Sequence, residues 1–325
     1  MKNIKKIITV LAGLVLVLTA TIIFANAKNN DDDKNSSTSE SSESESRNTA
    51  NNNNYNLQHI RVIRTPKSAT FANEDIPLNH FDVAESLERE LTQITYSHQH
   101  TLLTIRLAGR YLDLLDSLLQ EQNVPTDFKY LCVAESNLQH LISPAKAVGF
   151  WQFLQATGRQ YGLEINEEVD ERYHIEKSTV AACAYLKDSY KKYGSWTLAA
   201  ASYNTGIGNI NKAIETQKTS NYYDMVLHPE TTRYIFRIAA YKFILTNPEA
   251  YGFYVTEADK FDPFRYSEIT INKSIPSIVD FAKEHGTNYK IIKMLNPWLR
   301  KETLTNKSGK TYKIKIPTKD FREAK

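Results

Sequence analysis

Glu135 stands on the apolar side of a segment whose large apolar residues recur at helical spacing. Phe128, Leu131, Glu135 and Leu138 are three, four and three residues apart, so a helix would place them on one face. An ionised, unpaired carboxyl there costs several kcal/mol. Burial raises the pKa of a carboxyl, which is what a general acid at neutral pH needs. Periodicity alone favours the alternative, a buried glutamate that pairs with an arginine or caps an amide.

Three further short stretches set polar side chains among aromatic ones. They are Gly149-Phe150-Trp151-Gln152-Phe153, Ala201-Ser202-Tyr203-Asn204-Thr205-Gly206 and Glu230-Thr231-Thr232-Arg233-Tyr234. The amide of Gln152 can donate to and accept from an acetamido group, or it can be a buried structural side chain. Asn204 is either a polar contact of the site or a helix C-terminal cap, because Asn and Gly are common there.

The aromatic residues of these stretches, and the serine after Glu135, each allow two interpretations. Tyr203 and Trp151 can stack on a sugar ring or fill the core. Tyr234 shares a helical face with Ile238, Tyr241 and Leu245, so core packing is its default role. Ser136 can bond the carboxyl or a sugar, or lie on the helix surface.

The pair Glu135-Ser136 and the three stretches, in this order, resemble the motifs of the family 1 lytic transglycosylases. These are soluble-lytic-transglycosylase-like enzymes with a goose-lysozyme-like helical fold. The resemblance extends over about residues 75–250. Thr232 stands where the family commonly has arginine, and Ser202 where it frequently has alanine.

The resemblance implies a reaction on peptidoglycan that needs no metal and no cofactor. Glu135 would protonate the oxygen of the β-1,4 bond between N-acetylmuramic acid and N-acetylglucosamine, then take a proton from the C6 hydroxyl, giving a 1,6-anhydro end. The substrate's N-acetyl group would replace a second carboxylate. Consistently, no acidic residue lies in 149–153 or 201–206. The implied substrate-binding residues are Ser136, Gln152, Tyr203, Asn204 and Tyr234, with the tyrosine hydroxyl directed at Glu135.

Two alternatives remain beside this interpretation. One is a hydrolysing muramidase of the same fold, and the other is a non-catalytic peptidoglycan-binding protein. Other chemistries lack their motifs, since the chain has no HExxH, no GxxxxGK and no Gly-x-Ser-x-Gly. The motifs of the main domain are not basic, so we expect no nucleic-acid partner.

The elements that must position these residues are predicted to be helices. Leu103, Leu107, Tyr111, Leu114 and Leu118 form a one-sided apolar stripe. Residues 123–126 would end that helix, with Thr126 capping the next. Further helices are expected over 127–139, 149–161, 178–193, 196–203 and 231–246. With no period-two alternation from 80 to 250, the sequence predicts a mainly α, lysozyme-like catalytic domain over 57–262, its motifs within about 120–215.

The last residues, 263–325, have a different pattern. Residues 266–271 and 311–316 alternate like strands around two helical stretches near 276–285 and 288–295. This βααβ unit resembles a divergent lysin motif, carried by Ile275-Pro276-Ser277-Ile278, Asn288-Tyr289, Leu295-Asn296-Pro297-Trp298-Leu299 and residues 312–317. Its opening strand lacks the usual Gly-Asp turn. The resemblance implies peptidoglycan binding, with a stabilising subdomain as the alternative.

Charge is distributed unevenly along the chain. The formal net charge of the whole chain is only +3, which does not indicate any class of partner. Residues 266–317, however, contain ten Lys or Arg and four Asp or Glu. That local excess fits either attraction to an anionic polymer such as the cell wall or simple solubility.

The first 56 residues predict export. Three lysines, an apolar run over 7–24 and Ala25-Asn26-Ala27 are typical of a signal peptide over 1–27, or of an uncleaved membrane anchor. Sixteen of the 29 residues in 28–56 are Asn or Ser, which predicts a disordered linker. We expect a monomer in the periplasm or cell envelope, facing peptidoglycan. Cys132 and Cys183 are either a disulfide or two inert thiols.

Overall fold

The computed structural model describes residues 60–323. The predicted signal segment over 1–27 and the predicted linker over 28–56 lie outside the described residues. Within 60–323 no helix combines the length and the apolarity needed to cross a bilayer.

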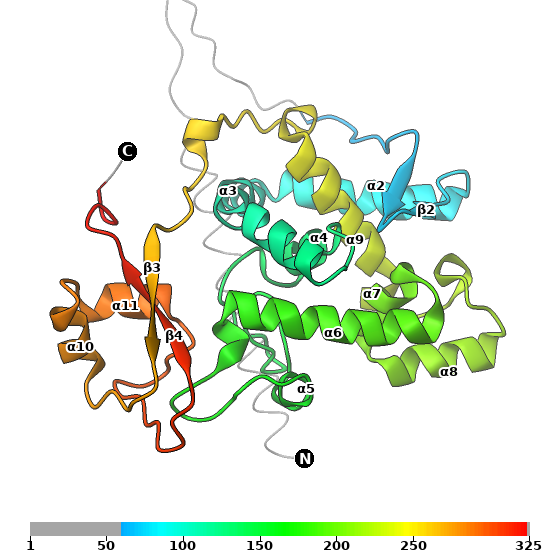
Figure 1. Cartoon of the computed structure of the whole chain (residues 1–325). Coiled ribbons are helices and arrows are strands. Elements are labelled where there is room, and N and C mark those ends of the chain that lie inside the picture. The colour runs from blue at the N-terminus through cyan, green and yellow to red at the C-terminus, as the bar shows by residue number, and fades with distance from the viewer. Residues whose placement is uncertain (1–59, 324–325) are drawn as a thin grey trace, which may run out of the picture. The chain divides into compact units, whose positions relative to one another are not determined.

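The predicted mainly α fold is confirmed (Figure 1). A short hairpin of β1 (Ala69–Phe71) and β2 (Glu74–Ile76) precedes the helices. The helices are α2 (Phe81–Tyr96), α3 (His98–Glu121), α4 (Phe128–Ser136), α5 (Gln155–Gln160), α6 (Ile175–Tyr193), α7 (Trp196–Thr205), α8 (Ile207–Gln217) and α9 (Pro229–Thr246). Single 3-10 turns lie at Glu171–Tyr173, Tyr222–Asp224, Pro248–Tyr251 and Glu257–Asp259.

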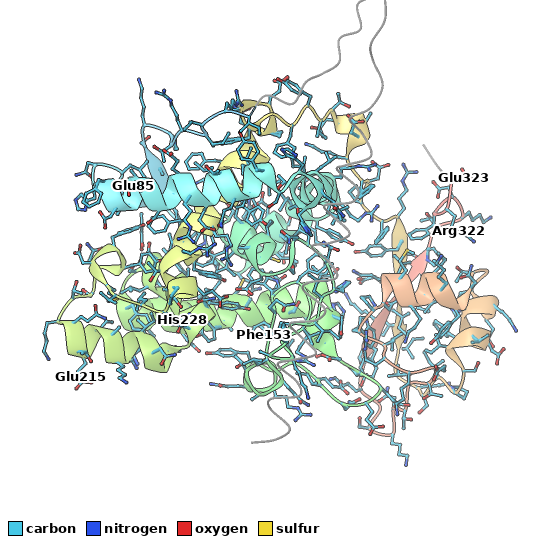
Figure 2. All side chains as sticks on the ribbon, turned by 180° about the vertical axis from the view of Figure 1, so that it is seen from behind. Glu85, Phe153, Glu215, His228, Arg322 and Glu323 are labelled. Carbon is cyan, nitrogen blue, oxygen red and sulfur yellow. The ribbon has the colours of Figure 1, made fainter. Side chains whose placement is uncertain are left out.

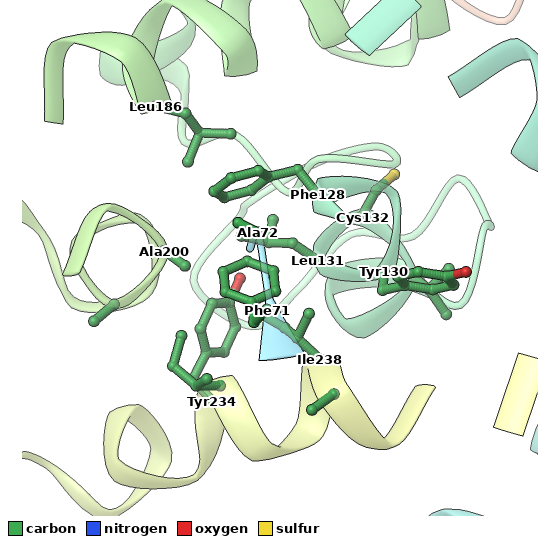
Figure 3. Close-up of a cluster of buried hydrophobic side chains, with 14 of the residues drawn as sticks. Phe71, Ala72, Phe128, Tyr130, Leu131, Cys132, Leu186, Ala200, Tyr234 and Ile238 are labelled. Carbon is green, nitrogen blue, oxygen red and sulfur yellow. The ribbon is translucent and has the colours of Figure 1, made fainter. Parts of the chain in front are cut away.

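Helix α4, which carries Glu135, is packed between α3 and α9. Phe128 and Leu131 on its apolar face are fully buried, and Phe128 meets the ring of Phe71 edge-on at 5.1 Å between centroids (Figure 3). The helix ends at Ser136 rather than at the predicted 139. Asn137 follows in the left-handed conformation with φ 49°, which asparagine tolerates better than most residues.

Two predictions, on the buried face of α3 and on the cap of α4, were wrong. The buried face of α3 consists of Thr101, Thr104, Ile105, Ala108, Leu115 and Leu119, whereas the predicted leucine stripe lies beside it and is only partly covered. Three of these six residues are small or carry a hydroxyl group, and Thr101 Oγ1 donates to the carbonyl oxygen of Ile94 at 2.5 Å, which allows this hydroxyl to be buried. Thr126 does not cap α4, whose N-cap is Asp127 without a side-chain bond.

The helix predicted over 149–161 exists only as α5. Residues 149–154 form a loop instead, in which Gly149 has φ 82° and Gln152 has φ 48°. Phe153 near the end of this loop is buried inside the helical domain, while Glu85 and Glu215 lie on its outer surface (Figure 2). The hairpin and α8 were not predicted.

The C-terminal unit has the predicted βααβ order. It consists of β3 (Tyr266–Ile271), α10 (Ile278–Glu284), α11 (Tyr289–Leu295) and β4 (Tyr312–Pro317), with the two strands antiparallel. Its core includes Ile278, Ile292, Leu299 and Ile314, which are fully buried.

The same core continues into the helical domain. Val148, Val169 and Tyr173 belong to the hydrophobic cluster of the C-terminal unit. Backbone bonds join the two parts, because Asp170 N donates to Trp298 O at 2.9 Å and Arg300 N donates to Glu168 O at 2.7 Å. The C-terminal unit is therefore packed against the segment that precedes α6.

Candidate active site

Glu135 lies in the last turn of α4, where it is partly buried and bonded to one phenol. The hydroxyl of Tyr234 donates to Glu135 Oε1, and Tyr234 itself is 1% exposed. The pKa of Glu135 is raised from its usual 4.5 to about 7, mainly by burial, and the charge of Glu230 contributes in the same direction. The Tyr234 bond and the Arg237 guanidinium act in the opposite direction. Much of the carboxyl is therefore protonated at neutral pH, as a general acid requires.

Helix α9 presents one row of polar side chains to this region. Glu230, Tyr234, Arg237 and Tyr241 are spaced four, three and four residues apart and so share a face. Tyr241 Oη donates to Asn137 Oδ1 at 2.6 Å, directly after the end of α4. Both interpretations of Tyr234 hold together, since its ring is core and its hydroxyl faces the acid.

Asn204 lies in the last turn of α7 and is bonded to the start of α9. Its Oδ1 accepts from Thr231 Oγ1 at 2.7 Å, and its Nδ2 donates to Glu230 Oε1 at 3.4 Å. The helix cap is Gly206, with φ 90°, so Asn204 is not a C-terminal cap. Asn204 is thus held beside Glu230, one of the residues whose charge acts on Glu135.

Tyr203 connects α7 to the loop over 149–154. Its hydroxyl donates to the carbonyl oxygen of Trp151 at 2.7 Å, and its ring meets Phe153 and Tyr185 edge-on. The Glu135 charge helps to raise the pKa of Tyr203, which places the phenol near the acid. Trp151 is fully buried and donates to Thr179 Oγ1 at 2.8 Å, so it is core and not a sugar-stacking wall.

The side chain of Gln152 stabilises the loop over 149–154 through hydrogen bonds to backbone carbonyl groups. Its Nε2 donates to the carbonyl oxygens of Gly149 at 2.8 Å and Leu141 at 3.2 Å. The structure therefore gives the amide nitrogen a structural role, which was one of its two predicted roles. The side chain remains partly exposed.

Ser136 is the predicted site residue that the structure does not bring to the site. It is 1% exposed, and its hydroxyl donates to the carbonyl oxygen of Cys132 one turn earlier. A predicted contact with substrate does not fit this burial. Cys132 and Cys183 are both free and buried, which corrects the disulfide alternative. Burial raises the pKa of the Cys183 thiol to about 12, so it stays protonated and unreactive.

Two ion pairs near the site were not found from the sequence. Arg172 and Asp170 are each 8% exposed and paired at 2.7 Å, and Arg172 Nη1 donates to the carbonyl oxygen of Phe153 at 3.2 Å. Glu90 on α2 is 2% exposed and pairs with Arg233 at 2.6 Å. The Asp-x-Arg spacing was the available signal for the first pair. The second joins residues 143 positions apart, for which the sequence holds no signal.

No group of three or more His, Cys, Asp or Glu side chains among residues 60–323 is arranged to hold a metal ion.

Comparison with known proteins matches two parts of the chain to family models. Residues 116–226 match the transglycosylase SLT domain, and residues 267–320 match the soluble lytic transglycosylase C-terminal LysM-like domain. These matches confirm the resemblance found in the motifs and in the βααβ unit.

Two kinds of curated relative are similar over parts of the chain. Membrane-bound lytic murein transglycosylase D of two Escherichia coli strains is 28% identical over 243 residues, which are 73% of this chain and 52% of the relative. A putative tributyltin chloride resistance protein of an Alteromonas species is 28% identical over 130 residues, 39% of this chain and 60% of that protein. The chain spans about half the length of the first of these relatives.

Proposed function

We propose that this chain, which carries an SLT transglycosylase domain followed by a LysM-like domain, is a lytic transglycosylase of peptidoglycan. It would cleave the β-1,4 bond between N-acetylmuramic acid and N-acetylglucosamine. The observation that carries the proposal is the partly buried Glu135 inside the SLT domain, with a pKa of about 7 and a hydrogen bond from Tyr234.

In the first step, protonated Glu135 gives its proton to the glycosidic oxygen as the bond from C1 to that oxygen breaks. Positive charge then develops at C1 of the muramyl residue, where the oxygen of the substrate's own N-acetyl group can stabilise it. The Tyr234 hydroxyl donates to the carboxylate that forms, and this hydrogen bond stabilises the negative charge of Glu135 between the two steps.

In the second step, the carboxylate of Glu135 takes the proton of the C6 hydroxyl while that oxygen bonds to C1. The 1,6-anhydro ring closes, and Glu135 returns to its protonated form. No water is consumed, and one carboxyl serves as acid and then as base.

Hydrolysis is the second candidate, and Glu230 is the observation that favours it. This carboxyl acts on Glu135 electrostatically and accepts a hydrogen bond from Asn204, so it is a second acid close to the reacting centre. A second carboxylate of this kind can activate water in inverting glycosidases.

Product analysis distinguishes the two reactions. Digestion of purified sacculi in heavy-oxygen water should release muramyl ends that are lighter than reducing ends by one water and that carry no label. Mass spectrometry of the separated fragments measures both properties. Labelled reducing ends as the only products would establish the muramidase instead.

We expect Tyr234→Phe to move the alkaline limb of the pH profile to higher pH. In the natural protein kcat/KM should fall above about pH 7, because the free enzyme must hold the proton on Glu135. The Tyr234 bond lowers the pKa of Glu135, so its removal raises that pKa. The limiting rate should fall about tenfold or more, since a hydrogen bond to a charged group contributes about 1.5–3 kcal/mol.

Tyr203→Phe is the matched control for this experiment. Its hydroxyl donates to a backbone carbonyl of Trp151 and not to Glu135, so the limb should stay in place. A Tyr234→Phe profile with an unshifted or lowered alkaline limb would contradict the assigned hydrogen bond.

The LysM-like unit is proposed to bind glycan strands and so to keep the catalytic domain on its substrate. Its local excess of ten basic over four acidic residues supports attraction to an anionic wall. The protein would then act in the cell envelope as a monomer facing peptidoglycan, and an uncleaved N-terminal segment would tether it to the membrane.

A further inference from the structure

A cavity of about 420 Å³ opens between α2 and α9, on the side of α9 that faces the end of α4. We call it the arginine pocket and define it by Arg233, Arg237, Glu90, Gln93, His100 and Tyr241. It is polar and partly open to solvent, and none of the roles described above uses it.

The arginine pocket lies next to the candidate acid. Tyr241 in its wall donates to Asn137, two residues after Glu135. The Arg237 guanidinium is close enough to Glu135 to lower the pKa of that carboxyl. A group bound by Arg237 would therefore belong to the same sugar residue as the bond being cleaved, or to its neighbour.

The buried carboxylate of Glu90 holds Arg233 and Arg237 in place. Glu90 is 2% exposed and pairs with Arg233 at 2.6 Å and with Arg237 at 3.5 Å. Arg233 Nη2 also donates to Gln93 Oε1 at 2.7 Å. Two guanidinium groups against one carboxylate leave one positive charge in excess within this cluster.

Arg237 retains the donors needed to bind an anion. Its side chain is 24% exposed, and among residues 60–323 its Nη groups form no hydrogen bond. A planar guanidinium with free N–H groups matches a carboxylate in two parallel bonds.

We propose that the arginine pocket binds a carboxylate of the stem peptide on the muramyl residue at the cleavage point. The inference rests on the proposed function and adds a substrate determinant to it. N-acetylglucosamine and amide-linked N-acetylmuramic acid are uncharged, so the anionic groups of a peptide-bearing strand are the carboxylates of its stems. The stem begins at C3 of the same sugar whose C1 bond breaks, which suits a cationic pocket beside Glu135.

The test compares peptide-bearing glycan strands with the same strands after an amidase has removed the stems and the lactyl carboxyl left on each muramyl residue has been converted to its methylamide, so that no carboxylate remains. On peptide-bearing strands, Arg237→Gln should lower kcat/KM by about 10- to 100-fold, mainly through KM, the effect expected for a lost charge-assisted hydrogen bond. On peptide-free strands the loss should be smaller by about tenfold or more, so the ratio of the two losses measures the contact with the stem. Assays run about two pH units below the Glu135 pKa of about 7, where this carboxyl is protonated in both proteins, remove the influence of Arg237 on that pKa.

Two variants serve as controls. Arg89→Gln removes the same charge from the exposed side of α2 outside the arginine pocket and should change neither substrate. Arg237→Lys keeps the charge without the bidentate geometry, so its loss should be intermediate. Arg237→Gln should fold, because Glu90 keeps its shorter bond to Arg233.

Binding separates this inference from the activity itself. In a Glu135→Gln background, calorimetry should show tighter binding of a soluble peptide-bearing fragment than of its peptide-free form, and Arg237→Gln should abolish that difference. An equal loss of kcat/KM on both substrates, or no loss on either, overturns the inference. Failure of the natural protein to cleave either substrate would reject the proposed function, while the binding comparison would still decide the role of the arginine pocket.

Discussion

Replacing Glu135 by glutamine is expected to lower kcat by about 10³-fold or more while the fold is retained. The amide has nearly the same shape, so it can still accept the Tyr234 hydroxyl, but it can neither give nor take the proton. General acid–base catalysis by a positioned side chain contributes about 10²- to 10⁴-fold to a rate, and here one side chain would serve both steps. The release of soluble fragments from sacculi measures the loss.

The same substitution should change how stability depends on pH. The folded protein holds the Glu135 proton up to about pH 7, whereas the unfolded chain releases it near 4.5. The folded state therefore binds more protons between these values, and the free energy of unfolding declines as the pH rises through that window. Glutamine does not titrate, so Glu135→Gln should gain up to about 3 kcal/mol relative to the natural protein above pH 7.

Denaturant unfolding at pH 4 and at pH 8 tests this difference. The gain should be present at pH 8 and absent at pH 4. A pH-independent difference would mean that the carboxyl is not the buried group described above. Retained binding to sacculi, with no fragment release from either the natural protein or the variant, would instead support the non-catalytic wall-binding alternative.

Gly149→Ala is expected to be the most destabilising of the simple substitutions near the site. Gly149 has φ 82°, and an added Cβ would lie 2.1 Å from the carbonyl oxygen of Arg172. Arg172 cannot move away easily, because Asp170 holds its guanidinium and Phe153 O accepts from it. Backbone strain of about 1–2 kcal/mol and overpacking of about 1–3 kcal/mol together predict a loss of about 2–5 kcal/mol.

Gly162→Ala is the matched control. Gly162 has φ 85°, nearly the same backbone conformation, but no heavy atom lies within 4 Å of the added Cβ. It should therefore show the strain alone, about 1–2 kcal/mol. Urea unfolding of both variants measures the difference. Equal losses would show that the contact with Arg172 is relieved and that the loop over 149–154 tolerates a side chain.

The loop connects this stability effect to the site. Trp151 O accepts a hydrogen bond from the Tyr203 hydroxyl, and Gln152 Nε2 donates to the carbonyl oxygens of Gly149 and Leu141. A displaced Gly149 should move Tyr203 relative to Glu135, so we expect the fragment release of Gly149→Ala to fall even at temperatures where the variant is folded.

Local periodicity in the sequence was sufficient for several features of this protein. It placed Glu135 on the apolar face with Phe128 and Leu131, because residues three and four apart on a helix must share a side. It also predicted the βααβ unit, since strand alternation and helix spacing are properties of neighbouring residues.

Features that depend on packing were missed or misjudged. The buried face of α3 differs from its leucine stripe, because the hydroxyls of Thr101 and Thr104 find carbonyl acceptors and can be buried. Residues 149–154 are predicted to be helical, but Gly149 and Gln152 have positive φ angles, and the backbone of Arg172 leaves no room for a side chain at Gly149.

The chemistry of Glu135 was decided at this tertiary level. The sequence identified a carboxyl on an apolar face, where the spacing by itself favoured a structural role. The bond from Tyr234 joins positions 99 residues apart, and Arg237 and Glu230 reach the acid from the same face of α9. A pKa is the sum of burial and charges from all sides, so it exists only once α4, α7 and α9 are packed together.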